Sequence, residues 1–180
     1  MRELSLAPDQ IISSGYEILH DIEMLQAYFQ ICQMGADKLP PVPVMHRDLF
    51  APHFNPALQA KFRVFAEANP RAEYFLLDGS HRTTAACLTH NECPAVLMAD
   101  DNDVKEMKQL VAQGRVFKYT SDSIEENRGD MLKHFEKMPN FQTTAQKTAK
   151  MVKRGVVPEY MTICFKAAQR PVARRSASDS

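Results

Sequence analysis

One short segment of the chain concentrates polar groups at the start of a predicted helix. An apolar stretch ends at Leu77, and six residues follow it, Asp78-Gly79-Ser80-His81-Arg82-Thr83. A helix N-terminus presents unpaired backbone N–H groups and about half a positive charge, so it attracts anions. Gly79 permits a close approach of backbone to ligand, Arg82 offers a planar fork for phosphate oxygens, and His81 can donate or relay a proton. With the hydroxyls of Ser80 and Thr83, the segment predicts a phosphate-binding loop.

The same residue types also occur where nothing binds. Asp-Gly is a common turn, serine is a good helix N-cap, and an arginine in the first turn of a helix is often simply solvated. The phosphate-binding interpretation is favoured here by the unbroken Gly-Ser-His-Arg block between two predicted apolar strands, at residues 74–77 and 94–98.

Phosphoryl transfer would require further groups around this loop. A base must accept the proton of the acceptor hydroxyl, and a metal ion must neutralise the phosphates. Asp78 is the predicted base, because it follows the strand directly beside the loop, and His81 is the second candidate for proton transfer. Arg47, in a predicted loop over residues 46–48, is a candidate second phosphate contact, although a loop face without a ligand is the simpler interpretation.

The elements that position these residues follow from apolar spacing. A strand over 74–77, a helix from Ser80 to about residue 90 and a strand over 94–98 predict a βαβ unit with parallel strands. Before it, we expect a helix over 18–34, a strand over 42–45 and a helix over 57–69. After it, we expect a helix ending at Gly114, an edge strand over 115–119 and helices begun by Ser123/Glu126, by Thr143/Gln146 and near Pro158.

The loop and its flanks resemble a known family. The run from Phe75 to Ala86, followed by Pro94-Ala95-Val96-Leu97, is similar to the signature of the ParB/sulfiredoxin superfamily. The resemblance covers about residues 40–99 and implies an α/β (α+β) fold, with a small mixed sheet. It also implies that Gly79, Ser80, His81 and Arg82 hold nucleotide phosphates.

Members of that superfamily differ at this loop. Sulfiredoxins carry a catalytic cysteine where this chain has Ser80, so reduction of sulfinic acids is not expected. ParB proteins bind CTP through an arginine-rich loop, whereas this chain has the single Arg82. Free serine kinases have Asp-Gly-x-His-Arg, which Asp78 to Arg82 resembles. The resemblance therefore implies phosphoryl transfer from ATP or ADP, with Mg²⁺, to a small hydroxyl-bearing metabolite.

The alternative is a nucleotide-gated module that binds DNA or protein without turnover. Residues 143–168 predict two helices separated by Gly155, with an apolar face of Ala145, Ala149 and Val152 on the first. Basic residues lie along it, namely Lys147, Lys150, Lys153 and Arg154. The second helix is mostly apolar over 159–166, whereas a helix that reads base edges presents Arg, Asn, Gln or Lys.

Composition sets the remaining limits. The 180 residues carry no net charge, which excludes a uniformly basic coat for nucleic acid. That total conceals a net charge of −5 over residues 1–100, −1 over 101–146 and +6 over 147–180. We expect a domain over 1–120 with its N-terminal helix, a helical extension over 121–169 and a disordered tail over 170–180. No apolar stretch is long enough to span a bilayer, and the cysteines lack metal-ligand spacing, so we expect a cytoplasmic protein with no membrane partner and no bound structural metal.

Overall fold

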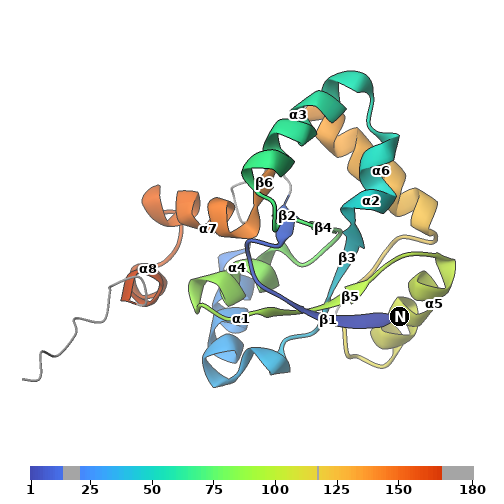
Figure 1. Ribbon diagram of the computed structural model, residues 1–180. Helices are drawn as coiled ribbons and strands as arrows, with labels where there is room; N and C mark the ends of the chain where they lie inside the picture. Colours follow the sequence, from blue (N-terminus) through green and yellow to red (C-terminus); the bar gives the residue numbers. More distant parts are fainter. Residues whose placement is uncertain (14–20, 117, 168–180) are drawn as a thin grey trace, which may run out of the picture.

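A computed structural model describes residues 1–13, 21–116 and 118–167, which form a six-stranded mixed sheet with helices on both faces (Figure 1). The strands are β1 (Arg2–Leu6), β2 (Ile11–Ser13), β3 (Val42–His46), β4 (Tyr74–Leu76), β5 (Cys93–Leu97) and β6 (Gln142–Thr143). The α-helices are α1 (Ile22–Met34), α2 (Arg47–Phe50), α3 (Pro56–Ala68), α4 (Ser80–Leu88), α5 (Asp101–Ala112), α6 (Ile124–Lys137), α7 (Thr144–Lys153) and α8 (Glu159–Ala167). Two short 3-10 helices are η1 (Ala36–Lys38) and η2 (Ala51–His53). The predicted α/β class with a mixed sheet is confirmed.

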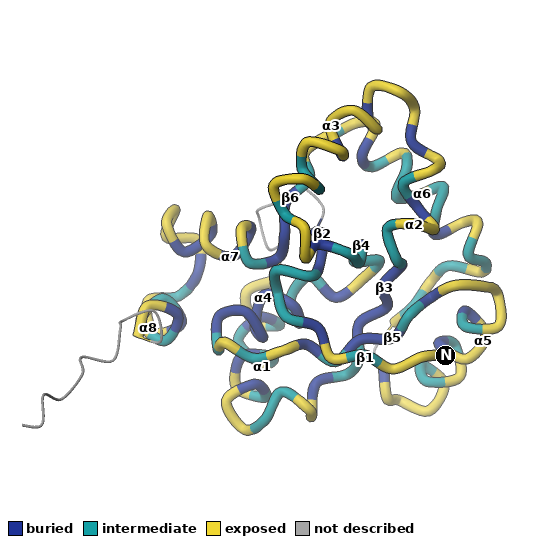
Figure 2. The backbone as a smooth tube through the Cα atoms, in the orientation of Figure 1, coloured by how far each residue is buried: buried dark blue, intermediate teal, exposed yellow. Residues whose placement is uncertain are grey.

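The order of the strands corrects the predicted βαβ unit. The sheet runs β1-β5-β3-β4-β2-β6, with β3 antiparallel to β4 and parallel to β5. Strands β4 and β5 are therefore antiparallel to each other and are separated by β3. The physical reason is the apolar character of β3, because four of its five residues are buried and it takes the central place (Figure 2).

Other expectations also need correction. The predicted helix over 18–34 begins at Ile22, capped by Asp21, and residues 14–20 lie outside the described part. Residues 46–48 are not a loop, because Arg47 and Asp48 open α2, and the His46 ring accepts a hydrogen bond from the Asp48 N–H. The described residues 115, 116, 118 and 119 form no strand. Strands β1, β2 and β6 were not predicted.

The two faces of the sheet bury different sets of side chains. Because successive residues of a strand point to opposite faces, Val44 and Met45 of β3 enter separate clusters. The Val44 face is covered by α1, α4, α7 and α8. The Met45 face holds the aromatic side chains of α2, α3, β4 and α6, and a third cluster lies under α5. The described residues from 121 to 167 thus supply side chains to the same clusters as the described residues before them, and the predicted tail over 170–180 lies outside the described part.

Candidate functional site

The predicted loop lies between β4 and α4, where one glycine makes the turn. Gly79 has a φ of +101°, in the left-handed region that favours glycine. A Cβ at this position would lie 2.5 Å from Val42 Cγ1 and 3.0 Å from two nitrogens of Arg82. The space beside Gly79 is therefore filled by the protein itself, and the glycine allows α4 to begin close against β3.

The N-terminus of α4 has no side-chain cap. Gly79 occupies the N-cap position and cannot supply one, and the first intrahelical bond runs from the Thr83 N–H to the Gly79 carbonyl. The N–H groups of Ser80, His81 and Arg82 precede that bond and have no carbonyl one turn back in the helix. The end of α4 keeps its attraction for negative charge.

A cavity of about 480 Å³ opens at this end of α4. Its floor is the loop itself, from Leu77 to Arg82. Met24 and Tyr28 of α1 line one side, and Asn127 of α6 lines another, together with the segment from Lys118 to Ser121. The volume lies within the range of about 300–1,000 Å³ typical of small-molecule sites.

The residue that sequence reasoning missed is Lys147. It lies in the first turn of α7, which begins with a complete capping box between Thr143 and Gln146. The lysine side chain is 2% exposed, and its Nζ donates a hydrogen bond of 2.5 Å to Ser80 Oγ. Burial lowers the pKa of Lys147 from 10.5 to about 8. The structure thus brings an amine to the first residue of α4.

A sequence signal for this burial exists. The predicted apolar face of this helix was Ala145, Ala149 and Val152, but Ala149 is exposed and only Val152 is buried. The buried face instead includes Thr144, Lys147, Thr148 and Met151. Lys147 follows Thr144 by three residues and precedes Met151 by four. That spacing is helical, yet a lysine inside it is more often solvated than buried.

His81 also faces the cavity. Its Nε2 atom is buried and has no hydrogen-bond partner among the described residues. Burial lowers the pKa of His81, and the nearby charge of Asp21 opposes that effect in part. A neutral ring is therefore favoured near neutral pH, and it can hold or release a proton at the cavity wall.

The Arg82 guanidinium, predicted to bind phosphate oxygens, forms hydrogen bonds with other groups of the protein. The side chain is buried, and its Nη1 donates to the carbonyl oxygens of Pro40 at 3.2 Å and Pro41 at 2.6 Å. Its Nη2 donates to Asp78 Oδ2 at 3.1 Å. These contacts tie α4 to the segment that enters β3, and a role of Arg82 in phosphate binding stays a prediction. Asp78 keeps a half-exposed carboxylate at the cavity.

Two predicted residues lie apart from the cavity wall. Thr83 is buried, and its hydroxyl donates to the carbonyls of Gly79 and Ser80 within α4. Arg47 donates from Nη1 to the Ala72 carbonyl at 3.1 Å, in the segment before β4. The cavity wall thus contains the loop from Asp78 to Arg82, and Lys147 contacts that loop through Ser80. Neither Thr83 nor Arg47 is among the lining residues.

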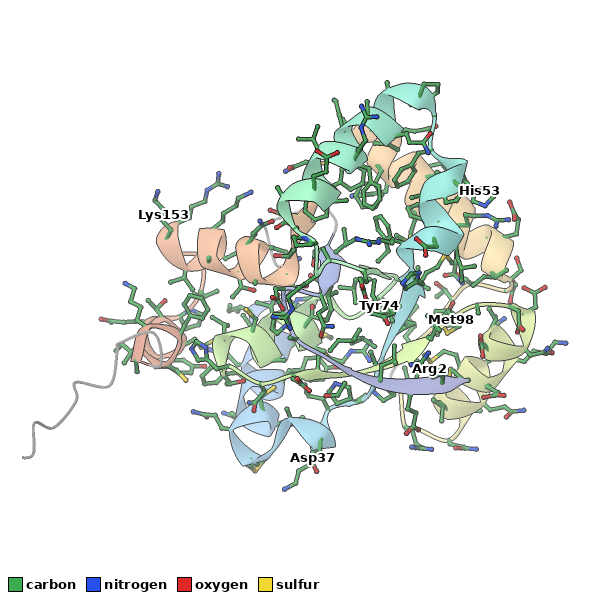
Figure 3. All side chains as sticks on the ribbon, in the orientation of Figure 1. Arg2, Asp37, His53, Tyr74, Met98 and Lys153 are labelled. Atoms are coloured by element: carbon green, nitrogen blue, oxygen red, sulfur yellow. The ribbon has the colours of Figure 1, made fainter. Side chains whose placement is uncertain are left out.

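The described residues include some of the side chains that could hold a metal ion or contact DNA. They contain no group of three His, Cys, Asp or Glu side chains placed to hold a metal ion. Of the basic residues predicted for a DNA contact, Lys147 is buried, while Lys153 is exposed at the end of α7 and points away from the molecule (Figure 3). Helix α8 exposes apolar Tyr160 and Ile163. No described helix has the length and apolar character needed to cross a membrane.

Comparison with protein-family models, with curated proteins and with solved structures finds no match for this chain. The resemblance to the ParB/sulfiredoxin superfamily therefore continues to depend on the loop motif.

Proposed function

We propose that the cavity beside α4 binds the phosphates of a nucleotide, and that the protein transfers a phosphoryl group to a small hydroxyl-bearing metabolite. One observation carries the proposal. Ser80 is the first residue of the uncapped helix α4, and its hydroxyl accepts a hydrogen bond from the buried amine of Lys147.

The charges around the loop support a local anion site. An ammonium has three N–H donors, and Ser80 Oγ accepts one of them from Lys147. Burying a charged amine is unfavourable unless an anion or several acceptors lie close to it. Because residues 1–100 carry a net charge of −5, the attraction for phosphate must come from these donors rather than from the general field of the domain.

The rest of the cavity suits a nucleotide. Tyr28, Met24 and Tyr119 provide aromatic and apolar surface for a base, and Asn127 provides a polar amide. The donor set fits Mg²⁺ only in part, because Asp78 is the one carboxylate among the lining residues. A magnesium ion would therefore be held chiefly by the phosphates, where it would neutralise their charge.

Proton transfer in this proposal is assigned to the loop. The Asp78 carboxylate accepts the proton from the acceptor hydroxyl, while its contact with Arg82 holds its orientation. His81 Nε2 is a second group that can hold a proton at the wall of the cavity. Phosphoryl transfer demands mainly positioning and charge stabilisation, so no covalent intermediate is needed.

Calorimetry with ATP, ADP and CTP, with and without magnesium, tests the binding step. We expect the wild-type protein to bind at least one of them with a Kd below about 1 mM. The Lys147→Met variant should bind at least about tenfold more weakly, because it lacks the ammonium. Lys153→Met is the matched control, since that lysine lies exposed on the same helix. Absence of binding to the wild-type protein would overturn the proposal.

Turnover is tested separately. Phosphorus NMR of the bound nucleotide, in the presence of a mixture of small hydroxyl-bearing metabolites, should show a new phosphate ester. Binding without any ester would leave a nucleotide-binding module. Retention on duplex DNA that weakens steeply with salt would then identify DNA as its partner.

A further inference from the structure

The geometry points to a second activity at this site: Ser80 and Lys147 form a serine–lysine dyad that hydrolyses carboxylic esters small enough to enter the cavity beside α4. This inference does not depend on the proposed binding of phosphate, because it uses the hydroxyl of Ser80 as a nucleophile.

The first argument is the contact between the two side chains. A serine hydroxyl becomes a nucleophile when a base within hydrogen-bond distance removes its proton. Lys147 Nζ lies 2.5 Å from Ser80 Oγ and reaches it from a different helix, 67 residues further along the chain. The lysine is 2% exposed and lies where α7 packs against α4, so its amine is shielded from solvent.

The second argument is the protonation of the amine. A base must be neutral to accept a proton, and burial lowers the pKa of Lys147 to about 8. A sizeable fraction of the amine is therefore neutral in mildly alkaline solution, which is not true of an exposed lysine.

The other ionisable groups near Lys147 do not replace it as the base. Helix α7 packs against α4, β2 and β6, and neither β2 nor β6 has an ionisable side chain. Helix α4 contributes His81, Arg82 and Cys87. His81 Nε2 has no hydrogen-bond partner among the described residues and so does not contact Ser80 Oγ. The Arg82 guanidinium donates to Pro40, Pro41 and Asp78, and burial raises the pKa of the Cys87 thiol to about 11. Along α7 itself, Lys150 and Lys153 lie on its exposed side.

The third argument concerns the oxyanion. Hydrolysis of an ester passes through a tetrahedral intermediate whose oxygen carries a negative charge, and backbone N–H groups stabilise it best. Ser80 is the first residue of α4, so the N–H groups without a helical carbonyl partner belong to Ser80 itself and to the next two residues, and they are the donors assigned to that oxygen. Ser80 also lines the cavity, which places a bound substrate next to this residue.

The reaction balances with water as the second reactant. Ser80 Oγ forms a bond to the carbonyl carbon while its proton passes to Lys147 Nζ. The carbon–oxygen bond of the ester then breaks, and the leaving alkoxide takes that proton from the ammonium. Water attacks the acyl-serine, gives a proton to Lys147, and releases the carboxylic acid as Ser80 recovers its proton.

Covalent labelling with a fluorophosphonate tests the dyad, because the serine displaces fluoride from phosphorus and gains a mass that can be located. We expect one label per wild-type chain, on Ser80, and a labelling rate that rises with pH through about 8. The protein should also release 4-nitrophenol from 4-nitrophenyl acetate. Ser80→Ala should abolish both signals, and Lys147→Met should slow both by about 100-fold or more.

Matched controls separate the dyad from general effects. Ser5→Ala and Lys153→Met remove the same side-chain types at exposed positions of β1 and α7, and both should react as the wild type does. Folding of Lys147→Met is checked by circular dichroism, and the variant should fold because it removes a buried charge. Lys147→Arg keeps a cation that cannot lose its proton, so it should lose labelling whether or not it binds nucleotide.

An unlabelled Ser80 in the wild-type protein overturns the dyad, and so does labelling that continues at the wild-type rate in Lys147→Met. Neither result bears on the nucleotide proposal, which calorimetry tests separately. Failure of nucleotide binding likewise leaves the labelling prediction in place.

Discussion

The amine of Lys147 is buried, with 2% of the residue exposed. We therefore expect the free energy of unfolding to depend on whether this amine is protonated. The pKa of Lys147 is about 8 in the folded protein, whereas a lysine in an unfolded chain has its ordinary pKa of 10.5. Between these values the unfolded chain holds a proton that the folded protein has lost, so stability rises with pH. Relative to Lys147→Met, the wild-type free energy of unfolding should rise by up to about 3 kcal/mol across this pH window.

Urea denaturation of both proteins across this pH range measures that difference. Burial also raises the pKa of the Cys87 and Cys93 thiols from 9.0 to about 11 and about 12, which lowers stability once the pH exceeds the ordinary thiol value. Because both proteins keep these cysteines, their effect cancels in the comparison. A difference that stays flat with pH would show that the amine is not desolvated.

Gly79 gives a second prediction at the scale of one residue. Gly79→Ala combines a left-handed φ with a Cβ only 2.5 Å from Val42 Cγ1. Gly114→Ala is the control, because Gly114 has a φ of +70° and a methyl group added there would meet no atom within 4 Å. We expect Gly114→Ala to destabilise the protein by about 1 kcal/mol and Gly79→Ala by about 2–4 kcal/mol. Equal losses in thermal denaturation would contradict the steric argument.

Residues of the site were predictable where they are contiguous. Asp78, Gly79, Ser80, His81 and Arg82 follow one another, and a turn before a helix is a local property of the sequence. The partners of their side chains depend on distant segments. The carbonyl oxygens of Pro40 and Pro41 accept hydrogen bonds from Arg82, and α7 brings Lys147 to Ser80. Neither contact can be read from the local sequence, because the partners are far apart in the chain.

At the scale of elements, Arg82 joins α4 to the entry of β3. Arg82→Met leaves two carbonyl oxygens without their donor, and a hydrogen bond from a charged group contributes about 1.5–3 kcal/mol. We expect a loss of about 2–4 kcal/mol in urea denaturation. Arg71→Met is the control, since Arg71 pairs with Asp9 at the surface, and it should change stability by less than about 1 kcal/mol. An equally small loss of stability in Arg82→Met would show that the hydrogen bonds from Arg82 to Pro40 and Pro41 do not stabilise the fold.

Most long helices and the strands β3, β4 and β5 were predicted close to their observed bounds, whereas strands β1, β2 and β6 were not predicted. Helices α3 and α6 have apolar spacing over ten or more residues, and α3, α6 and α7 all start at recognisable caps. Strands β2 and β6 have three and two residues, too few for any alternation to be visible. Their pairing depends on neighbours that are distant in the sequence, so the position of β3 between β4 and β5 was not predictable either.

At the scale of the molecule, the aromatic cluster joins the two halves of the chain. Phe135 of α6 lies 5.6 Å from the ring of Phe75 in β4 and 4.7 Å from that of Phe141. Phe135→Ala should destabilise the whole protein by about 3–5 kcal/mol, because it leaves a cavity in this cluster. Hydrogen exchange should show equal loss of protection in β4 and in α6. Loss confined to α6 would instead support the predicted boundary at residue 120.

The separation of Ser80 and Lys147 has a consequence for synthesis. The ribosome delivers the loop and α4 well before α7, so a nascent chain that ends before residue 147 presents a serine without its amine. A chain that ends before residue 142 also lacks β6, which pairs with β2 at one side of the sheet. The proposed reaction at Ser80 therefore requires that α7 has docked, and a chain that ends before residue 147 should not be labelled at Ser80.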